Sequence, residues 1–581
     1  MKNYISKGKK WGLVLLVGAI CSSCDSELDQ KPYYFTDEQI LEILNSDKEQ
    51  DQEKKNTIIT GLCAGLEGNF RISGTYNGYS SNAINATDGQ DIMLNARCSD
   101  MVVGTQQNFT RGGFYINMYN LNNNDFQPWR GDQSTTGYNY AMWALPCNIL
   151  TNANKVLTFV TEQVAEKGTP EVKNGRAAAL CVRAYSYMLL MERYQKAYLH
   201  GGKGGEGMPI YKVYGLNDPV APSSAEETFK FIMGDLNEAV ALFKETGKES
   251  AGYTAESKDI DLGVAQYLRA RVALWTGDYT QCIDACEDIL SHYKSFIAES
   301  NYGFKSKDFD AVQAGTKEVK AEENAFTLPW LNPECILGWK DGDGAGTYYY
   351  GNFNPFAGDG TGSNPLYMRV DDRFYNLINE NDYRKDNVLV ESKDFTYFKG
   401  NTHTLPSYTN TKWGATICLQ QTQRSEHTNT DQCKFRSSSV VLMLAEAYAE
   451  IGNEAMSKQV LNQLLAARTR EGASLLTCDN YKSGLALKDL IKLQWRIEMW
   501  GEGGIEFYNA KRWNTPIDRA GSKIHWTALS NSTLPVEYMT YEIPMQEYNF
   551  NPGWGRLFVR NLNNLKTGSL YFFQKFMNLD G

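Results

Sequence analysis

Apolar residues recur at three- and four-residue spacing along much of the chain, which predicts a mainly helical protein. Helices are expected at residues 140–157, 172–198 and 223–244. The first should be interrupted near Pro146, because proline has no N–H to donate within a helix. Acidic Glu226 and Glu227 suit the start of the third helix, where the helix dipole favours negative charge.

Two further segments are each predicted to be a pair of helices joined through a glycine. The first comprises 264–276 and 279–293 around Gly277, and the second comprises 439–451 and 454–468 around Gly452. The first pair resembles a tetratricopeptide unit, with small residues where two helices would pack closely. Such pairs bury their faces only by stacking on neighbours, so about four pairs are expected, split along the chain.

Helical periodicity is almost absent from residues 294–435, which contain Gly-, Asp-, Asn- and Tyr-rich stretches. A segment of this length within a compact helical protein usually has a function. A similar aromatic, Asn-rich stretch spans 76–138, and we expect the two to form one lobe. The predicted fold is therefore mainly α, a TPR-like superhelix of helical pairs with a large irregular, loop-rich lobe inserted.

The N-terminus resembles a lipoprotein signal. Four lysines precede the apolar run Trp11 to Ile20, which has the length of a signal peptide core and is too short to span a bilayer. Ser22-Ser23-Cys24 then resembles a lipobox, although Cys21 stands where leucine is usual. We expect residues 1–23 to be removed and Cys24 to carry acyl chains, which would hold the protein on a membrane. An ordinary cleaved signal peptide is the alternative.

Composition excludes two classes of protein. The 581 residues include 68 acids and 58 bases, a net charge of −10 with no long basic run, which argues against a nucleic-acid binder. After the first twenty residues no stretch approaches the roughly 18 consecutive apolar residues of a membrane span, so the chain is not a polytopic transporter.

No catalytic or metal motif stands out. H-E-x-x-H, G-x-S-x-G and P-loop patterns are absent, and no enzyme activity or cofactor is expected. Asp341-x-Asp343-Gly resembles the start of a calcium loop, but Ala345 and the lack of a suitably placed Glu break the pattern; a structural calcium there is the alternative. Cys282 and Cys286 share a helix face and, without a nearby pair of histidines, are interpreted as core positions.

Several short blocks, in order along the chain, carry a family resemblance. They are the acidic stretch Asp25 to Pro32, Ala153 to Leu157, Arg183 to Tyr187, Gly207 to Ile210, Leu444 to Tyr448, Ala467 to Arg470, Lys511 to Trp513 and Glu542 to Pro544. Together they resemble the SusD/RagB family of outer-membrane nutrient-binding lipoproteins. Where the family has an Arg and an Asp, this chain has Ile505 and Asn509, so any ion pair made by those two residues is expected to be lost. The tail 561–581 extends past the family's usual end.

The resemblance implies one SusD-like domain over 24–581, with an N-terminal part of about 24–245, a C-terminal part of about 260–560 and the irregular insertion at about 294–435. It implies a lipid-anchored protein on the outward face of the outer membrane. Such a protein would bind a glycan and deliver it to a SusC-type TonB-dependent transporter. RagB-like binding of peptides is the main alternative, and a surface glycosidase or a repeat scaffold for protein partners are two others.

Glycan binding typically uses aromatic faces, which we expect in the irregular lobe and not on the helical pairs. The candidate stacking residues are Tyr348, Tyr349, Tyr350, Phe353, Trp413 and Phe114. For each of them, ordinary packing within a loop is the alternative.

Overall fold

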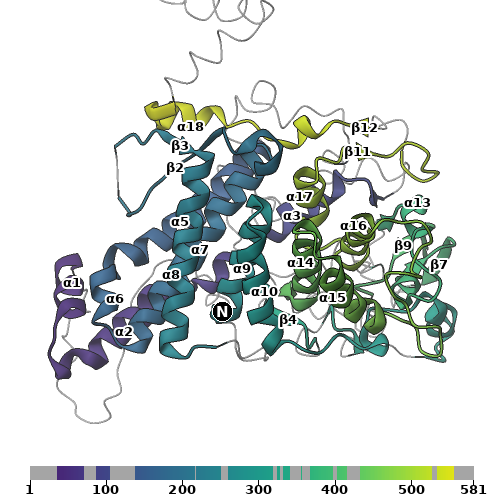
Figure 1. Cartoon of the computed structure of the whole chain (residues 1–581), viewed down its shortest axis with the longest axis horizontal. Coiled ribbons are helices and arrows are strands. Elements are labelled where there is room, and N and C mark those ends of the chain that lie inside the picture. The colour runs from purple at the N-terminus through teal and green to yellow at the C-terminus, as the bar shows by residue number, and fades with distance from the viewer. Residues whose placement is uncertain are drawn as a thin grey trace, which may run out of the picture.

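Long helices packed one on the next make up most of the protein, and short strands form small sheets at several places around them (Figure 1). The computed structural model describes residues 36–70, 87–104, 119, 138–215, 218–249, 259–317, 323–327, 332–339, 355, 367–396, 402–414, 432–526 and 533–554. Figure 1 sets α5, α7 and α8 beside α9 and α10, with α14, α15 and α16 beyond them. The mainly helical fold predicted from the sequence is confirmed.

The helices are α1 (Asp37–Asn45), α2 (Gln52–Cys63), α3 (Thr87–Ala96), α5 (Tyr138–Phe159), α6 (Glu162–Glu166), α7 (Pro170–Tyr194), α8 (Ala225–Thr246), α9 (Leu262–Thr276), α10 (Tyr279–His292), α11 (Phe309–Gln313), α13 (Asp372–Tyr375), α14 (Ser437–Glu450), α15 (Glu454–Ala467), α16 (Leu487–Glu498), α17 (Ile505–Arg512) and α18 (Met545–Phe550). The strands are β1 (Met101–Val103), β2 (Glu206–Pro209), β3 (Pro222–Ser224), β4 (Cys335–Trp339), β5 (Met368–Val370), β6 (Val388–Leu389), β7 (Lys393–Thr396), β8 (Thr402–Leu405), β9 (Thr409–Asn410), β10 (Gln432–Arg436), β11 (Ile517–Asp518) and β12 (Thr533–Leu534).

Helices that follow one another in sequence also pack on one another. α7 contacts α5 and α8, α8 contacts α9, and α9 contacts α10; α14 then packs on α10, α15 and α16. The tetratricopeptide-like pair α9–α10 turns at Gly277, whose φ of +78° favours glycine. Ala265 and Ala270 are fully buried, as expected for close helix packing. Cys282 and Cys286 are buried free cysteines with sulfurs 4.0 Å apart, which confirms them as core positions.

The start of α8 agrees with its sequence signals. The Ser224 side chain accepts a hydrogen bond from the Glu227 N–H at 3.1 Å, and the Glu227 carboxylate accepts one from the Ser224 N–H at 2.9 Å. This capping box satisfies donors that the helix itself leaves free.

The interruption expected at Pro146 does not occur, because α5 runs through it from Tyr138 to Phe159. Proline cannot donate to the carbonyl four residues earlier, which belongs to Met142. A guanidinium nitrogen of Arg193 donates to that carbonyl instead, at 3.2 Å. A side chain from α7 therefore supplies the donor that Pro146 lacks.

The two irregular segments meet in one antiparallel sheet of order β1-β5-β9-β6. β1 comes from the segment 76–138 and β5 from the segment 294–435, with Met101 opposite Val370. The expectation that both segments contribute to one lobe is confirmed. A second sheet pairs β4 with β10, which leads directly into α14.

Arg512 has a carboxylate partner despite the departure from the family pattern. Its guanidinium pairs with both oxygens of Glu446, at 2.5 and 2.6 Å, and its Nε donates to Asn509 at 2.8 Å. Arg512 therefore forms an ion pair here with an acid from α14, Glu446. Within the described residues, no helix combines the length and the hydropathy that a membrane crossing requires.

Candidate binding site

A pocket of about 530 Å³ lies between α5, α7, the segment that follows β2, and α18. Its volume falls within the roughly 300–1,000 Å³ typical of small-molecule sites. The aromatic residues that line it are Trp143, Tyr187, Tyr211 and Tyr214, and its polar side chains include Thr151, Asn154 and Glu547. In sequence these residues span more than 400 positions, so only the fold brings them together.

Hydrogen bonds from α5 and α7 hold the segment after β2 in place. The Tyr187 hydroxyl donates to the Pro209 carbonyl at 3.0 Å and accepts from the Tyr211 N–H at 2.8 Å. The Asn154 amide donates to the Tyr211 carbonyl at 2.9 Å. This wall of the pocket is therefore fixed by two helices.

A buried ion pair supports the same wall. Arg183 pairs with both oxygens of Asp235, at 2.7 and 2.8 Å, and both side chains are buried. Its remaining donors reach the Asn154 side-chain oxygen at 3.3 Å and the Lys212 carbonyl at 3.1 Å. Burial raises the pKa of the Asp235 carboxyl, and the hydrogen bonds from Arg183 offset part of that rise.

Glu547, on α18, contributes its carboxylate to the pocket lining. It accepts hydrogen bonds from the indole N–H groups of Trp143 at 3.2 Å and Trp554 at 3.0 Å, and from the Asn551 amide at 3.3 Å. Burial raises the pKa of Glu547, and all the groups that oppose this rise are neutral hydrogen-bond donors. Burial and the nearby charge of Glu547 raise the pKa of Tyr211 to about 12.

Two of the side chains that line the pocket are apolar and exposed to solvent. Val213 is 41% exposed and Tyr214 is 52% exposed, unusual values for large apolar residues in this structure. The Tyr214 N–H donates to the Thr158 hydroxyl at 3.0 Å, and the Lys155 ammonium lies 5.1 Å from the centre of the Tyr214 ring. An aromatic ring is thus presented to solvent beside the cavity.

The chemistry of the pocket suits binding better than catalysis. Among the described residues that line it, Glu547 is the only acid, whereas glycoside hydrolysis ordinarily uses two carboxyl groups. The described part of the chain also contains no cluster of three or more His, Cys, Asp or Glu side chains arranged to hold a metal ion. Aromatic faces, an amide, a hydroxyl and one carboxylate can together recognise a small polar ligand.

Most of the residues predicted to stack on a ligand lie outside the described residues. These are Phe114, Tyr348, Tyr349, Tyr350 and Phe353; the same holds for Cys24, the Asp341-x-Asp343 loop and the tail 561–581.

Trp413 is described, and it is 5% exposed. Its ring lies 5.9 Å from that of Phe326 and 6.3 Å from that of Trp500, with the Lys412 ammonium 4.9 Å away. In this structure Trp413 is therefore packed in the interior, where its ring faces are covered by protein groups.

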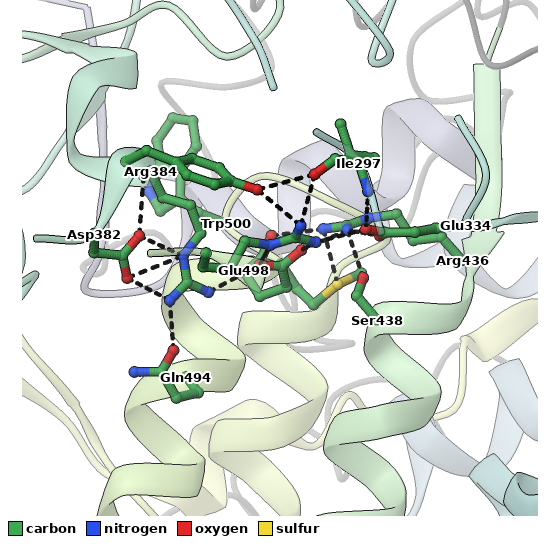
Figure 2. Close-up of polar contacts among 12 residues, drawn as sticks. Ile297, Glu334, Asp382, Arg384, Arg436, Ser438, Gln494, Glu498 and Trp500 are labelled. Carbon is green, nitrogen blue, oxygen red and sulfur yellow. Dashed lines mark hydrogen bonds and ion pairs between the residues drawn. The ribbon is translucent and has the colours of Figure 1, made fainter. Parts of the chain in front are cut away.

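A cluster of buried charges lies away from the pocket and joins the lobe to the helices (Figure 2). Glu498, at the end of α16, accepts hydrogen bonds from Arg384 at 2.8 Å, Arg436 at 2.6 Å and Arg468 at 2.8 and 3.0 Å. Glu334 accepts from Arg468 at 2.6 Å and from Arg436 at 2.7 Å. Burial alone would raise the pKa of Glu498, but the charges of Arg468, Arg436 and Arg384 lower it well below its usual value.

The cluster extends at both ends through further charged pairs. Asp382 pairs with Arg384 at 2.5 Å, and Glu502 pairs with Lys412 at 2.5 Å and Arg436 at 2.7 Å. Four acids therefore face four bases: Glu334, Asp382, Glu498 and Glu502 against Arg384, Lys412, Arg436 and Arg468. Every group is paired, and all are buried except Glu502, whose side chain is 13% exposed, so the cluster has a structural role.

Asp235→Asn tests whether the buried pair supports the pocket wall. The change leaves the buried Arg183 without its counter-charge, and we expect the free energy of unfolding to fall by about 3–5 kcal/mol. Amide hydrogen exchange should also accelerate at residues 211–215, because Arg183 holds the Lys212 carbonyl. Denaturant titration and exchange mass spectrometry measure the two effects.

Glu238→Gln on the same helix is the matched control. The Glu238 side chain, which pairs with Arg176, is 33% exposed. In the variant Arg176 still has Glu162 as an ion-pair partner at 3.6 Å. We therefore expect the free energy of unfolding to fall by no more than about 1 kcal/mol. Unchanged exchange at 211–215 in Asp235→Asn would show that Arg183 does not fix this wall.

Comparisons with known proteins identify the fold and give a family match over part of the chain. A SusD-like carbohydrate binding protein from Bacteroides vulgatus ATCC 8482 is similar in structure, with a TM-score of 0.62, 20% identity, and coverage of 86% of this chain and 97% of that chain. Surface glycan-binding protein A from Bacteroides thetaiotaomicron, in complex with laminarihexaose, has a TM-score of 0.55, 14% identity, and coverage of 85% and 98%. Surface glycan-binding protein A from Bacteroides fluxus has a TM-score of 0.55, 17% identity, and coverage of 85% and 96%.

At these identities the likeness establishes a shared fold. A comparison with curated protein sequences gives no match. The SusD family model matches residues 307–567, which include the C-terminal helices and much of the irregular segment. The chain therefore resembles the SusD/RagB family over residues 307–567, and it shares the fold of SusD-like structures over most of its length.

Proposed function

We propose that the protein binds a carbohydrate without transforming it. The observation that carries this proposal is the match, over nearly their whole length, to solved proteins that include a SusD-like carbohydrate binding protein and a surface glycan-binding protein in complex with laminarihexaose. The pocket beside α18 is consistent with a binding role, since it offers aromatic faces and a single acid.

The principal glycan contacts are proposed to come from the irregular lobe, through Tyr348, Tyr349, Tyr350, Phe353 and Phe114. Pairing of β1 with β5 supports this, because both irregular segments then emerge from one sheet. Loops on a rigid scaffold are where binding groups usually concentrate. Trp413 belongs to the same segment and is buried, so it takes part in this proposal through packing alone.

Anchoring through acylated Cys24 would place the protein on the outer membrane, with its binding surface facing outward. Delivery of the glycan to a SusC-type TonB-dependent transporter completes the proposed role. Both steps are supported by the match to the SusD family model over residues 307–567 and by the N-terminal sequence Ser22-Ser23-Cys24.

A glycan array and a peptide library, applied to the soluble fragment 25–581, test the ligand class. We expect glycans to bind, and Tyr348→Ala combined with Tyr350→Ala to weaken that binding by about 1–3 kcal/mol in total, taking about 0.5–1.5 kcal/mol for each aromatic contact. Thermal unfolding should change little if the two rings are exposed in a loop.

Binding of peptides and not glycans would favour a RagB-like role, and hydrolysis of a bound glycan would favour a glycosidase. If the double variant lowers thermal stability and leaves binding unchanged, these tyrosines belong to the core and the ligand binds elsewhere.

Cys24→Ala tests the membrane anchor. Without the thiol that acyl chains modify, the protein should be released from the outer membrane, because three such chains contribute about 0.8 kcal/mol for each buried CH₂ group. Membrane fractionation and surface labelling measure this, with Cys21→Ala as the control that should remain anchored. A Cys24→Ala variant that stays on the surface would exclude lipidation at this residue.

A further inference from the structure

We propose that the pocket between α5, α7 and α18 binds a ligand that carries a protonated primary amine, with Glu547 as the partner of the ammonium group. The site is separate from the loops proposed for the principal glycan contacts. Either proposal can therefore fail while the other stands.

Among the described residues, Glu547 has no counter-charge, unlike the buried acid Glu446. Glu446 provides the comparison, because it too accepts hydrogen bonds from two tryptophan indoles, those of Trp495 at 2.9 Å and Trp513 at 2.8 Å. In that site the guanidinium of Arg512 also pairs with both carboxylate oxygens. Burial opposes ionisation of Glu446, but Arg512 and the indoles outweigh it and lower the pKa.

At Glu547 the two indoles are present, but no described side chain supplies the cation. Trp143 and Trp554 donate to its oxygens, yet no described Lys, Arg or His side chain pairs with it. A carboxylate removed from water is strongly stabilised by an opposite charge. A cation supplied by a ligand would complete at Glu547 the arrangement that Arg512 completes at Glu446.

The remaining walls of the pocket also suit an ammonium group. Trp143 and Tyr211 line the cavity beside Glu547, and aromatic faces attract cations. The Thr151 hydroxyl donates to the Cys147 carbonyl at 2.9 Å, which leaves its oxygen able to accept a hydrogen bond. None of the described residues that line the pocket is basic. The nearby Lys155 is exposed and its ammonium lies over the Tyr214 ring, with no ion pair to Glu547.

An amino sugar with a free amine and a lysine side chain share this chemistry, and paired ligands separate them. D-glucosamine has an amine where D-glucose has a hydroxyl. Likewise, N-acetyl-lysine amide has a side-chain amine that N-acetyl-norleucine amide lacks. Calorimetry or ligand-observed NMR on the purified full chain should show one amine binding about 10-fold or more tightly than its neutral partner, the usual effect of a charged hydrogen bond. The pair that shows this preference identifies the source of the amine.

Glu547→Gln should reduce the preference for the amine to about one while binding of the neutral partner persists. Glu542→Gln is the matched control, because it removes the same charge from the same segment at an exposed residue outside the pocket lining, and it should leave the preference unchanged. Tyr214→Ala at the exposed edge is a second variant that should fold normally and weaken binding of the amine.

Three results would each overturn the proposal. They are equal affinity of the wild-type chain for the members of both pairs, no binding of any of the four compounds, and a preference for the amine that persists in Glu547→Gln. None of them bears on whether the irregular lobe binds a glycan.

Discussion

The position of the irregular lobe depends on one constraint, the complete pairing of eight charged groups, four from the lobe and four from the C-terminal helices and the residues next to them. Removing such charges from water is costly, and their mutual attraction offsets that cost only when every group has a partner at close range. Glu498 lies at the centre and accepts hydrogen bonds from three arginines that come from separate segments. Any displacement of the lobe relative to α14, α15 and α16 would separate at least one of these pairs. The cluster thus favours a single arrangement over others of similar apolar burial.

This constraint explains how a largely irregular segment can serve a recognition function. The described segments that include Glu334, Arg384 and Lys412 are held by ion pairs to Arg436, Glu498 and Glu502, which lie at the ends of α14 and α16 or next to them. The helical pairs contribute in a second way, because α5 and α7 form the fixed walls of the pocket that contains Glu547. Under the two proposals, the helical scaffold and the lobe would each bind a separate ligand.

Local signals in the sequence were sufficient to predict where the helices lie, but they could not predict the pocket or the buried charge cluster. Periodicity located α7, α8 and the pair α9–α10 because neighbouring turns of one helix share a face. It could not anticipate that Arg193 would satisfy the carbonyl left free by Pro146, since that donor comes from another helix. The ion cluster and the pocket were missed for the same reason. Their members are scattered over hundreds of residues, and a single Arg or Glu in a sequence does not reveal its partner.

Aromatic content was also an ambiguous guide. Trp413 resembled a stacking residue by composition alone, yet it lies between Phe326 and Trp500 in the interior. Burial of an aromatic ring contributes so much to stability that packing competes with ligand binding for every such residue. Only the surroundings of the ring, which depend on the whole fold, decide between the two roles.

The central claim, that the buried charges fix the lobe on the helices, is tested most directly by hydrogen exchange in Glu498→Gln. Glu450→Gln, which removes an exposed acid paired with Lys488 on the surface, is the control. The account predicts that β4, residues 383–387 and the start of α14 lose protection together in Glu498→Gln, while α7 and α8 keep theirs. Loss of protection confined to the last turn of α16, or spread equally over α7 and α8, would contradict it.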